Sequence, residues 1–299
     1  MGPLDAPQVP VSDMKTNVTS LILAAKEWCN ATASQIQRLG PTRDNEQRFR
    51  CNICGRNAKA KKLALGRELP SCSCGSSVRL RALVHHLTRE LFGASLAIPE
   101  IPKRSDIIGI DMSGARLYAD RLARRLGYTN TFLHKAPYLD ITAPGEEWLS
   151  RCDFVISSDV FEHVAAPVAI AFDNVLRLLR PGGLFVLTVP WTKGGVTVEH
   201  FPQLTGQHIE RREQGAVLVG RGQDGLVREY DNLIFHGGEG ETLEMRVFSQ
   251  DGLLQELSRA GFTDIRIHAE PWAEFGIVWE HPWSLPITAR RPATAEQRV

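Results

Sequence analysis

The strongest fold signal in this chain lies between Asp153 and Trp191, which read DFVISSDVFEHVAAPVAIAFDNVLRLLRPGGLFVLTVPW. Phe154 to Ile156 form a short apolar run typical of a strand covered on both faces. From Ala165 to Leu179 apolar residues recur at helical spacing, and Pro181-Gly182-Gly183 is expected to end that helix. Leu184 to Val189 predict a second covered strand. A strand, a helix and a strand joined in this order form one crossover unit of a parallel α/β sheet.

This segment resembles the class I S-adenosylmethionine-dependent methyltransferases of the type 11-like kind. In that family an apolar strand, a Glu-His-Val turn, a helix, a Leu-Lys-Pro-Gly-Gly break and a strand follow one another. Glu162-His163-Val164 and Leu179-Arg180-Pro181-Gly182-Gly183 stand at those places here. The resemblance implies a doubly wound, mostly parallel, seven-stranded Rossmann-like sheet. It also implies S-adenosylmethionine as the methyl donor.

Length and composition fit one large α/β domain with a small module. The chain has 299 residues, of which 43% are hydrophobic and 23% are charged. A formal net charge of +1 gives it no general basic field of the kind that attracts nucleic acid, so a nucleic-acid partner is not expected. No apolar run approaches the roughly 20 residues of a membrane span. The N-terminus lacks a basic region followed by an apolar core, so we expect a cytoplasmic protein.

The pattern divides the chain into three predicted parts. Residues 1–46 are expected to hold a Pro-rich tail and an amphipathic helix from Asn17 to Leu39. Residues 47–104 hold a cysteine module and a connecting helix, and residues 105–299 hold the main domain. An insert at 192–243, which would help to form the acceptor pocket, follows the second covered strand. The elements predicted in and after the insert are a hairpin from Ala216 to Tyr230, a strand from Thr242 to Phe248, a helix from Gln250 to Ala260 and a last strand from Phe262 to Ala269.

Four cysteines predict a metal site. Cys51 and Cys54 form a C-x2-C pair, and after seventeen intervening residues Cys72 and Cys74 form a C-x-C pair. Two thiolate pairs on tight turns suit a tetrahedral zinc ion, and four sulfur ligands leave no open position for catalysis. We therefore predict a zinc-ribbon-like structural module. The alternative is a set of four reduced thiols with no metal.

The donor site is expected at the carboxyl ends of the strands, where ligands bind in this fold. The first strand, Asp106 to Ile110, leads into the turn Asp111-Met112-Ser113-Gly114, and a helix is predicted from Ala115 to Leu126. The family places a glycine-rich turn here, close to the methionine part of the cofactor, and only Gly114 matches it clearly. Asp111 either receives the ammonium group of the cofactor or caps the helix.

Two further segments complete the predicted donor site. By resemblance, Asp140 stands near the adenine amine; its alternative role is to cap a turn. Ser157, Ser158 and Asp159 end the strand that begins the crossover unit. The acid that usually grips the ribose after the second strand has no counterpart in the predicted strand from Tyr128 to His134.

Asp159, Glu162 and His163 follow that strand at the place where acceptor and methyl group should meet. They resemble the Glu-x-x-Glu-His magnesium site of ubiquinone-pathway O-methyltransferases, with aspartate for the first glutamate, so Mg²⁺ is one expectation. The alternative is a structural Glu-His pair that bonds the backbone. The predicted general bases are His163 and then His200, with His236 as a third candidate.

Two groups of residues have two interpretations each. The arginines of the connecting helix contact an anion or form a solvated face. The aromatic residues near the C-terminus form a lid over the acceptor or pack in the core. The groups are Arg79, Arg81 and Arg89, and Trp272, Phe275, Trp279 and Trp283.

The leading interpretation is a methyltransferase that acts on an oxygen of a small molecule or sugar in a glycan or natural-product pathway. Uncharacterised bacterial methyltransferases with a zinc ribbon resemble the whole arrangement. The second interpretation is an RNA base methyltransferase, since ribosomal guanine N1 methyltransferases also join a zinc module to this fold. The third is a zinc-bearing interaction protein whose cofactor site has decayed. The sequence sets no oligomeric state.

Overall fold

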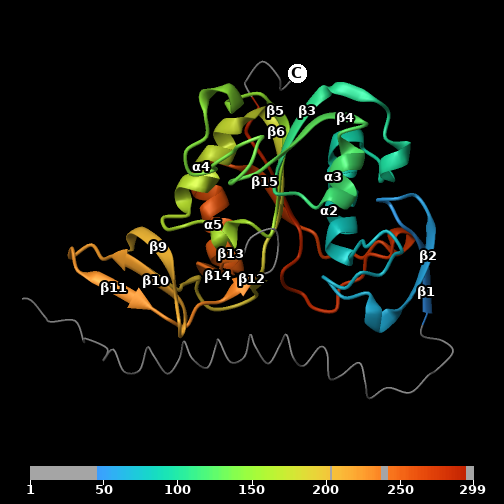
Figure 1. Cartoon of the computed structure of the whole chain (residues 1–299). Helices are drawn as coiled ribbons and strands as arrows, with labels where there is room; N and C mark the ends of the chain where they lie inside the picture. The colour runs from blue at the N-terminus through green and yellow to red at the C-terminus, as the bar shows by residue number, and fades with distance from the viewer. Residues whose placement is uncertain (1–45, 203, 237–241, 294–299) are drawn as a thin grey trace, which may run out of the picture. The chain divides into compact units, whose positions relative to one another are not determined.

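A computed structural model describes residues 46–202, 204–236 and 242–293 (Figure 1). Within it, the described residues from Gln47 to Ala60 and from Ala64 onward form one compact unit. The helix predicted from Asn17 to Leu39 lies outside the described residues.

A mixed sheet of six strands forms the centre of this unit. Its strand order is β15-β16-β6-β5-β3-β4. The four strands from β6 to β4 run parallel, whereas β16 is antiparallel to both of its neighbours. The strands are β3 (Arg104–Met112), β4 (Leu126–Thr131), β5 (Cys152–Ser158), β6 (Leu179–Thr188), β15 (Thr263–Ile267) and β16 (Ile287–Arg290).

The described sheet has six strands where seven were expected. The connection from β4 to β5 makes only one isolated bridge, Phe132 to Tyr138. Pro137 and Pro144 interrupt this connection, and a proline has no N–H to donate to a strand ladder. The strand predicted from Phe262 to Ala269 is present as β15, but it is not the last one, because β16 follows it and lies between β15 and β6.

Helices cover both faces of the sheet, which confirms the doubly wound architecture (Figure 1). Alternate residues of β5 point to opposite faces: Phe154 and Ile156 belong to one apolar core and Val155 to the other. The first core is completed by α2 and α3, and the second by α4 and α5. The helices are α2 (Val78–Phe92), α3 (Arg116–Leu122), α4 (Ala169–Leu178) and α5 (Gln250–Ala260).

Local sequence explains where these helices begin. Ser77 and Ser249 cap α2 and α5, because each side chain accepts a hydrogen bond from the first turn. Helix α4 begins later than predicted, since Pro167 disfavours helical geometry at the residue before it. Strand β6 begins directly after α4, so Pro181-Gly182-Gly183 lies at the start of a strand and not in a loop.

The cysteine module shares the core of the sheet's α2 face. Its backbone forms β1 (Glu46–Arg50), β2 (Asn57–Lys61) and the short helix η1 (Lys62–Ala64). The fully buried Arg81 donates to the carbonyls of Phe275 at 2.8 Å and Gly276 at 3.0 Å. Gly276 adopts φ 63°, and a Cβ there would lie 2.5 Å from the ring of Phe49. The module is therefore packed against the chain that follows β15.

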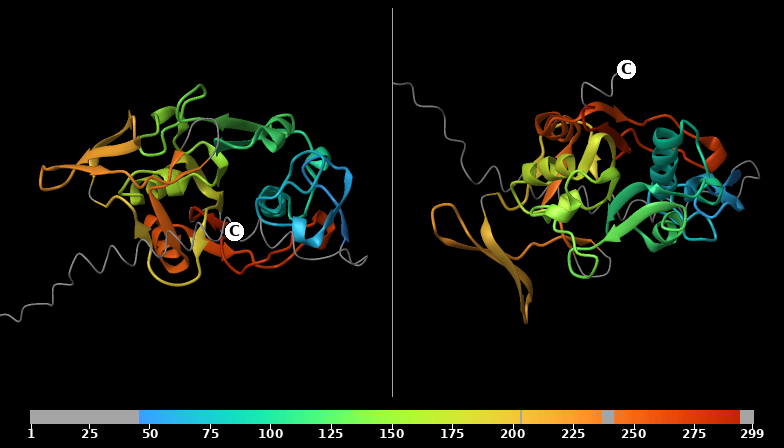
Figure 2. Two further views of the ribbon diagram at one scale, coloured as in Figure 1. Left: turned by 60° about the horizontal axis from the view of Figure 1, so that its bottom comes forward. Right: turned by 90° about the horizontal axis from the view of Figure 1, so that it is seen from above.

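The insert forms a small sheet of its own. The predicted hairpin is present as β10 (Gly215–Arg221) and β11 (Val227–Tyr230), and β9 (Thr205–Arg212) adds a third strand that was not predicted. This sheet stands apart from the central one (Figure 2). The remaining short strands are β7 (Trp191–Thr192), β8 (Val198–Glu199), β12 (Phe235–His236), β13 (Thr242–Leu243) and β14 (Arg246–Ser249), so the single strand predicted from Thr242 to Phe248 is two.

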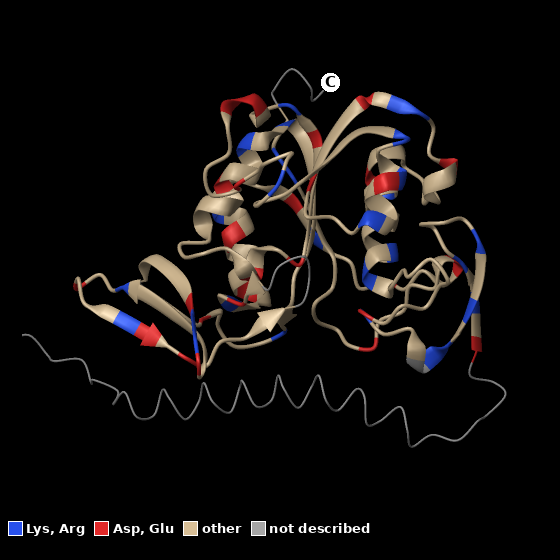
Figure 3. Cartoon of the chain, viewed as in Figure 1, with Lys and Arg blue, Asp and Glu red and all other residues tan. Residues whose placement is uncertain are grey.

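Both acidic and basic residues are spread over the described chain (Figure 3). On β9 to β11, for example, Arg212 pairs with both Glu210 and Glu229. None of the helices in the described ranges has the length and apolar character needed to cross a bilayer.

Candidate functional site

The turn after β3 lies where the strand order reverses, because β4 and β5 flank β3 on opposite sides. Ser113 has φ 58°, an uncommon conformation for a residue with a side chain. Its N–H donates to the carbonyl of Thr131 at 2.8 Å. Asn130 then holds Gly114 with two 2.8 Å hydrogen bonds, one to its N–H and one to its carbonyl. Asn130 was missed by the sequence analysis. Its two bonds hold the turn, which lacks the other glycines of the family's glycine-rich turn.

Gly114 is required by packing. A Cβ on it would lie 2.2 Å from Asp111 Oδ2 and 2.8 Å from the hydroxyl of Tyr118. The substitution Gly114→Ala should lower the free energy of unfolding by about 2 kcal/mol, the usual range for overpacking a rigid site. Chemical denaturation measures this. Gly194→Ala, at a glycine with no atom within 4 Å of the added Cβ, is the matched control; equal effects of the two substitutions would contradict the packing argument.

Asp111 faces the protein interior. Its Oδ2 accepts hydrogen bonds from Tyr118 at 2.7 Å and Tyr128 at 2.8 Å, while Oδ1 is buried with no partner in the described part of the chain. Burial raises the pKa of Asp111 to about 7. The N-cap of α3 is Ala115, so the capping role is wrong. The Asp111 carboxylate therefore packs against the turn at Gly114 from the protein interior. Its contact with the ammonium group of the cofactor stays a prediction.

The raised pKa of Asp111 predicts a pH dependence of stability. The folded state binds this proton more tightly than the unfolded chain, whose aspartate pKa is about 3.9. Stability from this group is therefore complete below about pH 4 and is lost as pH rises toward 7. Asp111→Asn should remove this part of the slope. We expect wild type to lose more thermal stability than Asp111→Asn between pH 5 and pH 8; parallel curves would contradict the assignment.

The other predicted donor residues lie at or near the same sheet edge. Met112 is in the apolar core, so only its backbone faces the edge. Ser157 is buried, with an unpaired hydroxyl among the described residues, and Ser158 is bonded to Thr188 at 2.9 Å. Asp140 Oδ1 accepts from the N–H and the hydroxyl of Thr142, the turn-capping role that the sequence analysis left open.

Asp159 is held by Arg67 of the cysteine module and by Arg79 of helix α2. It adopts φ 54° after β5, and its carboxylate pairs with Arg67 at 2.8 Å and Arg79 at 3.1 Å. Burial would raise its pKa, but the two guanidinium charges hold the pKa of Asp159 well below its usual range. Asp159 is therefore an anion already paired with cations.

This pairing excludes Asp159 as a magnesium ligand in the described arrangement. Glu162 is almost fully buried, and burial followed by the charge of Asp159 raises its pKa well above the usual range. His163 Nδ1 lies 2.9 Å from the carbonyl of Leu243, and its Nε2 lies 3.7 Å from Glu162. In the described ranges, the four module cysteines are the only grouping of three or more metal-ligating side chains. The expectation of Mg²⁺ has no support here, and the backbone-bonding alternative fits His163.

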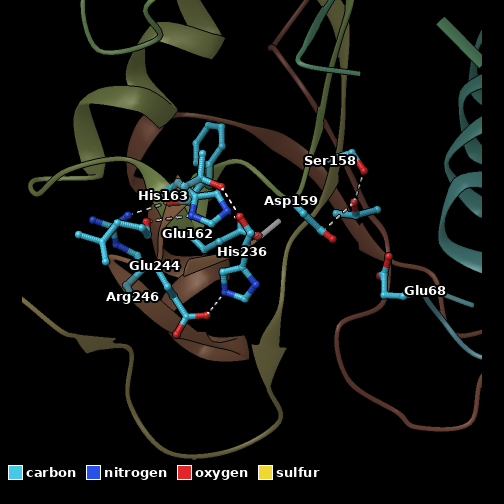
Figure 4. A network of polar contacts seen from close by, with 12 residues as sticks. Glu68, Ser158, Asp159, Glu162, His163, His236, Glu244 and Arg246 are labelled. Atoms are coloured by element: carbon cyan, nitrogen blue, oxygen red, sulfur yellow. Dashed lines mark hydrogen bonds and ion pairs between the residues drawn. The ribbon is translucent and has the colours of Figure 1, made fainter. Parts of the chain in front are cut away.

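His236 of the insert and Glu244, which directly follows the insert, lie beside His163 (Figure 4), and His200 bonds Glu244. Glu244 Oε1 lies 2.9 Å from His200 Nε2, and Glu244 Oε2 lies 2.6 Å from His236 Nε2. Although burial alone would raise it, these bonds hold the pKa of Glu244 at about 2. The hydrogen bond to Glu244 raises the pKa of His236. The rings of His163 and His236 are 5.3 Å apart.

These contacts separate the three candidate bases. His163 is largely buried, and burial lowers its pKa. His200 is also mostly buried, and its ring faces Glu244. The His236 side chain is 43% exposed, and its Nε2 is hydrogen-bonded to Glu244. Its Nδ1 has no hydrogen-bond partner in the described part of the chain. The geometry therefore favours His236, which the sequence analysis ranked third, and it adds Glu244, which that analysis missed.

The strand β14 holds this cluster against the end of β5. Arg246 is fully buried and donates to Glu199 at 2.6 Å and to the carbonyl of Phe161 at 2.7 Å. The N–H of Met245 donates to the carbonyl of Glu162 at 2.7 Å. Phe161 and Glu162 belong to the short helix η4 (Phe161–His163). The chain that directly follows the insert is thus bonded to η4, the predicted meeting point of donor and acceptor.

The four module cysteines fit a zinc ion. Their sulfur atoms all lie within 4.8 Å of one another, with Cys51 3.7 Å from Cys74 and Cys54 3.8 Å from Cys72. Gly55 and Gly75 have φ of 77° and 87°, the left-handed turns expected after each pair. The donor set would hold zinc as a closed structural site.

Burial separates the members of the two ambiguous groups, and of the three arginines only Arg89 is exposed. Arg79 and Arg81 are not on a solvated face: Arg79 pairs with Asp159, and Arg81 is fully buried. Phe275 lies in the apolar core, and Trp272 and Trp279 pack against it. These three residues therefore pack in the core and do not form an aromatic lid.

Part of the chain is similar to known proteins. Residues 74–185 match a family model described as a methyltransferase domain. No curated protein matches the sequence. Similar solved structures include the CurJ carbon methyltransferase, with 16% identity and a TM-score of 0.43 over 73% of this chain and 56% of that one. Thus the chain spans little more than half of CurJ.

Two further structures cover more of the other chain. A 1,6-didemethyltoxoflavin N1-methyltransferase from Burkholderia thailandensis shares 12% identity, with a TM-score of 0.39 over 97% of this chain and 94% of that one. A sugar N-methyltransferase from a Streptoalloteichus species shares 13% identity, with a TM-score of 0.40 over 74% and 88%.

The matched segment contains the turn after β3, the strand β5 and the crossover to β6. These are the parts that the sequence analysis identified with the donor site, and they lie in a doubly wound sheet. Residues 74–185, which hold these parts, are similar to a methyltransferase domain.

Proposed function

We propose that the protein transfers a methyl group from S-adenosylmethionine to a hydroxyl oxygen of a small molecule or sugar, with His236 as the general base. The observation that carries this proposal is the pair of His236 and Glu244. Glu244 is ionised and bonds Nε2 of His236, so the neutral imidazole presents its Nδ1 lone pair. A hydroxyl acceptor loses a proton on methylation, and a base at that atom assists the step.

The donor would lie along the carboxyl edge of β3 and β5. Ser113 and Gly114 leave room for the backbone to approach it, and Ser157 to Asp159 border it from the neighbouring strand. Asp140 is proposed for the adenine side. When bound, the sulfonium donor supplies an electrophilic methyl carbon, so the chain has mainly to align the acceptor oxygen with it.

The proton path is short in this arrangement. His236 Nδ1 accepts the hydroxyl proton as the new C–O bond forms, and the resulting imidazolium stays bonded to the Glu244 carboxylate. His200 bonds the other oxygen of Glu244 and keeps the carboxylate in place. His163 packs against the His236 ring and orients it. His236 is thus the proposed catalytic residue, and His163 and His200 are proposed as positioning residues.

The acceptor class is tested by following the methyl carbon. The protein is incubated with ¹³C-methyl S-adenosylmethionine and a panel of sugars and phenols, alongside matched amines, and products are read by carbon NMR. The proposal predicts methyl ethers. Transfer to amines alone, with no ether in any hydroxyl sample, would overturn oxygen methylation and leave the methyltransferase assignment intact.

A further inference from the structure

Arg67 and Arg79 each contact the same two carboxylates. Arg79 Nη2 lies 2.7 Å from Glu68, and Arg67 also donates to Glu68. On the other side both arginines reach Asp159, and Arg79 donates to Ser158, the last residue of β5. We call Arg67 and Arg79 the arginine clamp. It lies at the carboxyl end of β5, beside the edge proposed for the donor.

The two carboxylates of the clamp differ in how firmly they are held. Asp159 has 21% of its side chain exposed, and Thr188 bonds both its backbone N–H and its carboxylate. Glu68 has 50% of its side chain exposed. Every hydrogen bond of the Glu68 side chain to another described residue comes from Arg67 or Arg79. Glu68 is therefore the exchangeable partner.

The charge balance of the clamp also distinguishes Glu68 from Asp159. Two guanidinium groups and Asp159 leave one positive charge, and Glu68 neutralises it. The clamp itself is fixed, because Arg67 Nε donates to the carbonyl of Ser284 at 3.1 Å and Arg67 accepts a backbone bond from Arg79. Fixed guanidinium groups bind carboxylates through paired, charge-assisted bonds, whereas a half-exposed ion pair contributes little.

We propose that the arginine clamp is a carboxylate-binding site and that Glu68 occupies it as an internal competitor, which the carboxylate of a ligand displaces. The ligand carboxylate is either that of the donor's methionine portion or an acid group of the acceptor. The cysteine module and the helix that follows it then contribute directly to ligand binding, because Arg67 belongs to the module and Arg79 to α2. This inference is independent of which acceptor atom is methylated.

The test compares wild type with Glu68→Gln, which removes the charge and keeps the shape. Calorimetry measures S-adenosylhomocysteine, which carries the methionine carboxylate, and 5′-methylthioadenosine, which lacks it. If the donor is the source, Glu68→Gln should bind S-adenosylhomocysteine at least about fivefold more tightly, with 5′-methylthioadenosine unchanged. The matched control is Glu229→Gln, which removes an equally exposed carboxylate paired with Arg212; it should change neither affinity.

A second arm distinguishes the acceptor. With S-adenosylhomocysteine saturating, glucuronate and glucose are titrated into both proteins. Tighter binding of glucuronate alone to Glu68→Gln, with no change for S-adenosylhomocysteine, would assign the clamp to an acidic acceptor. The proposal is overturned if Glu68→Gln changes neither affinity, or if Glu229→Gln reproduces its effect. Neither result depends on His236. Failure of the carboxylate-site proposal can therefore be distinguished from failure of the proposed oxygen methylation.

Discussion

Substitution of His236 by alanine is expected to lower kcat for methylation of a hydroxyl acceptor by about 10²- to 10⁴-fold, the usual contribution of a general base. Binding of S-adenosylhomocysteine should stay within about twofold, because His236 is assigned to the acceptor and not to the donor. Stability should change little, since the side chain is 43% exposed. Steady-state kinetics with a hydroxyl acceptor, together with calorimetry, measures both quantities.

The matched control is His208→Ala, which removes an exposed histidine that also pairs with a glutamate, Glu210. This control should retain full activity. If kcat of His236→Ala stays within threefold of wild type, His236 is not the general base.

The pH profile should identify the same residue. A base works in its neutral form, so the rate should rise with pH through the pKa of His236, which the hydrogen bond that His236 donates to Glu244 raises above its usual value. Glu244→Gln removes the charge that stabilises the imidazolium. Its inflection should therefore move to lower pH while its maximal rate falls. An inflection that stays in place would mean that another group titrates.

Removal of the metal is expected to have the second largest effect. Cys51→Ser should abolish stoichiometric zinc and lower the free energy of unfolding by about 4 kcal/mol or more, in the range for loss of a structural metal. Cys51 is fully buried, and its sulfur lies 3.3 Å from the hydroxyl of Ser76, which Arg81 also bonds. Since the module carries Arg67 and leads into the helix that carries Arg79, affinity for S-adenosylhomocysteine should fall as well.

Zinc analysis, thermal unfolding and calorimetry on the full chain measure these effects. Cys152→Ser is the matched control, because Cys152 is buried in the sheet and away from the cluster. That substitution should lower stability and leave zinc content intact. A Cys51→Ser protein with unchanged stability and no zinc in wild type would favour four reduced thiols.

The parts of the fold that follow from local pattern were predicted well. Buried strands such as Phe154 to Ile156 and the helix Gln250–Ala260 each carry their own periodicity and end signals. The four cysteines likewise carry their signal in spacing alone. The strand β16 was missed because its place in the sheet depends on antiparallel pairing with β6, about a hundred residues away in sequence.

The candidate site was predicted only in part for the same reason. His200 and Glu244 are 44 residues apart in sequence, and they meet only because β8 pairs with β14. The sequence alone leaves open whether Arg79 lies on a solvated helix face, because its partner Asp159 is 80 residues away in sequence. Pattern identified the sheet edge, but the ion pairs across it depend on tertiary contacts.

A structure of the full chain with S-adenosylhomocysteine bound is the most direct test. The account predicts the ligand across the turn at Ser113 and Gly114, with its sulfur turned toward His236. A ligand bound at another edge, or a sulfur that faces away from His236 with no path for an acceptor between them, would contradict it.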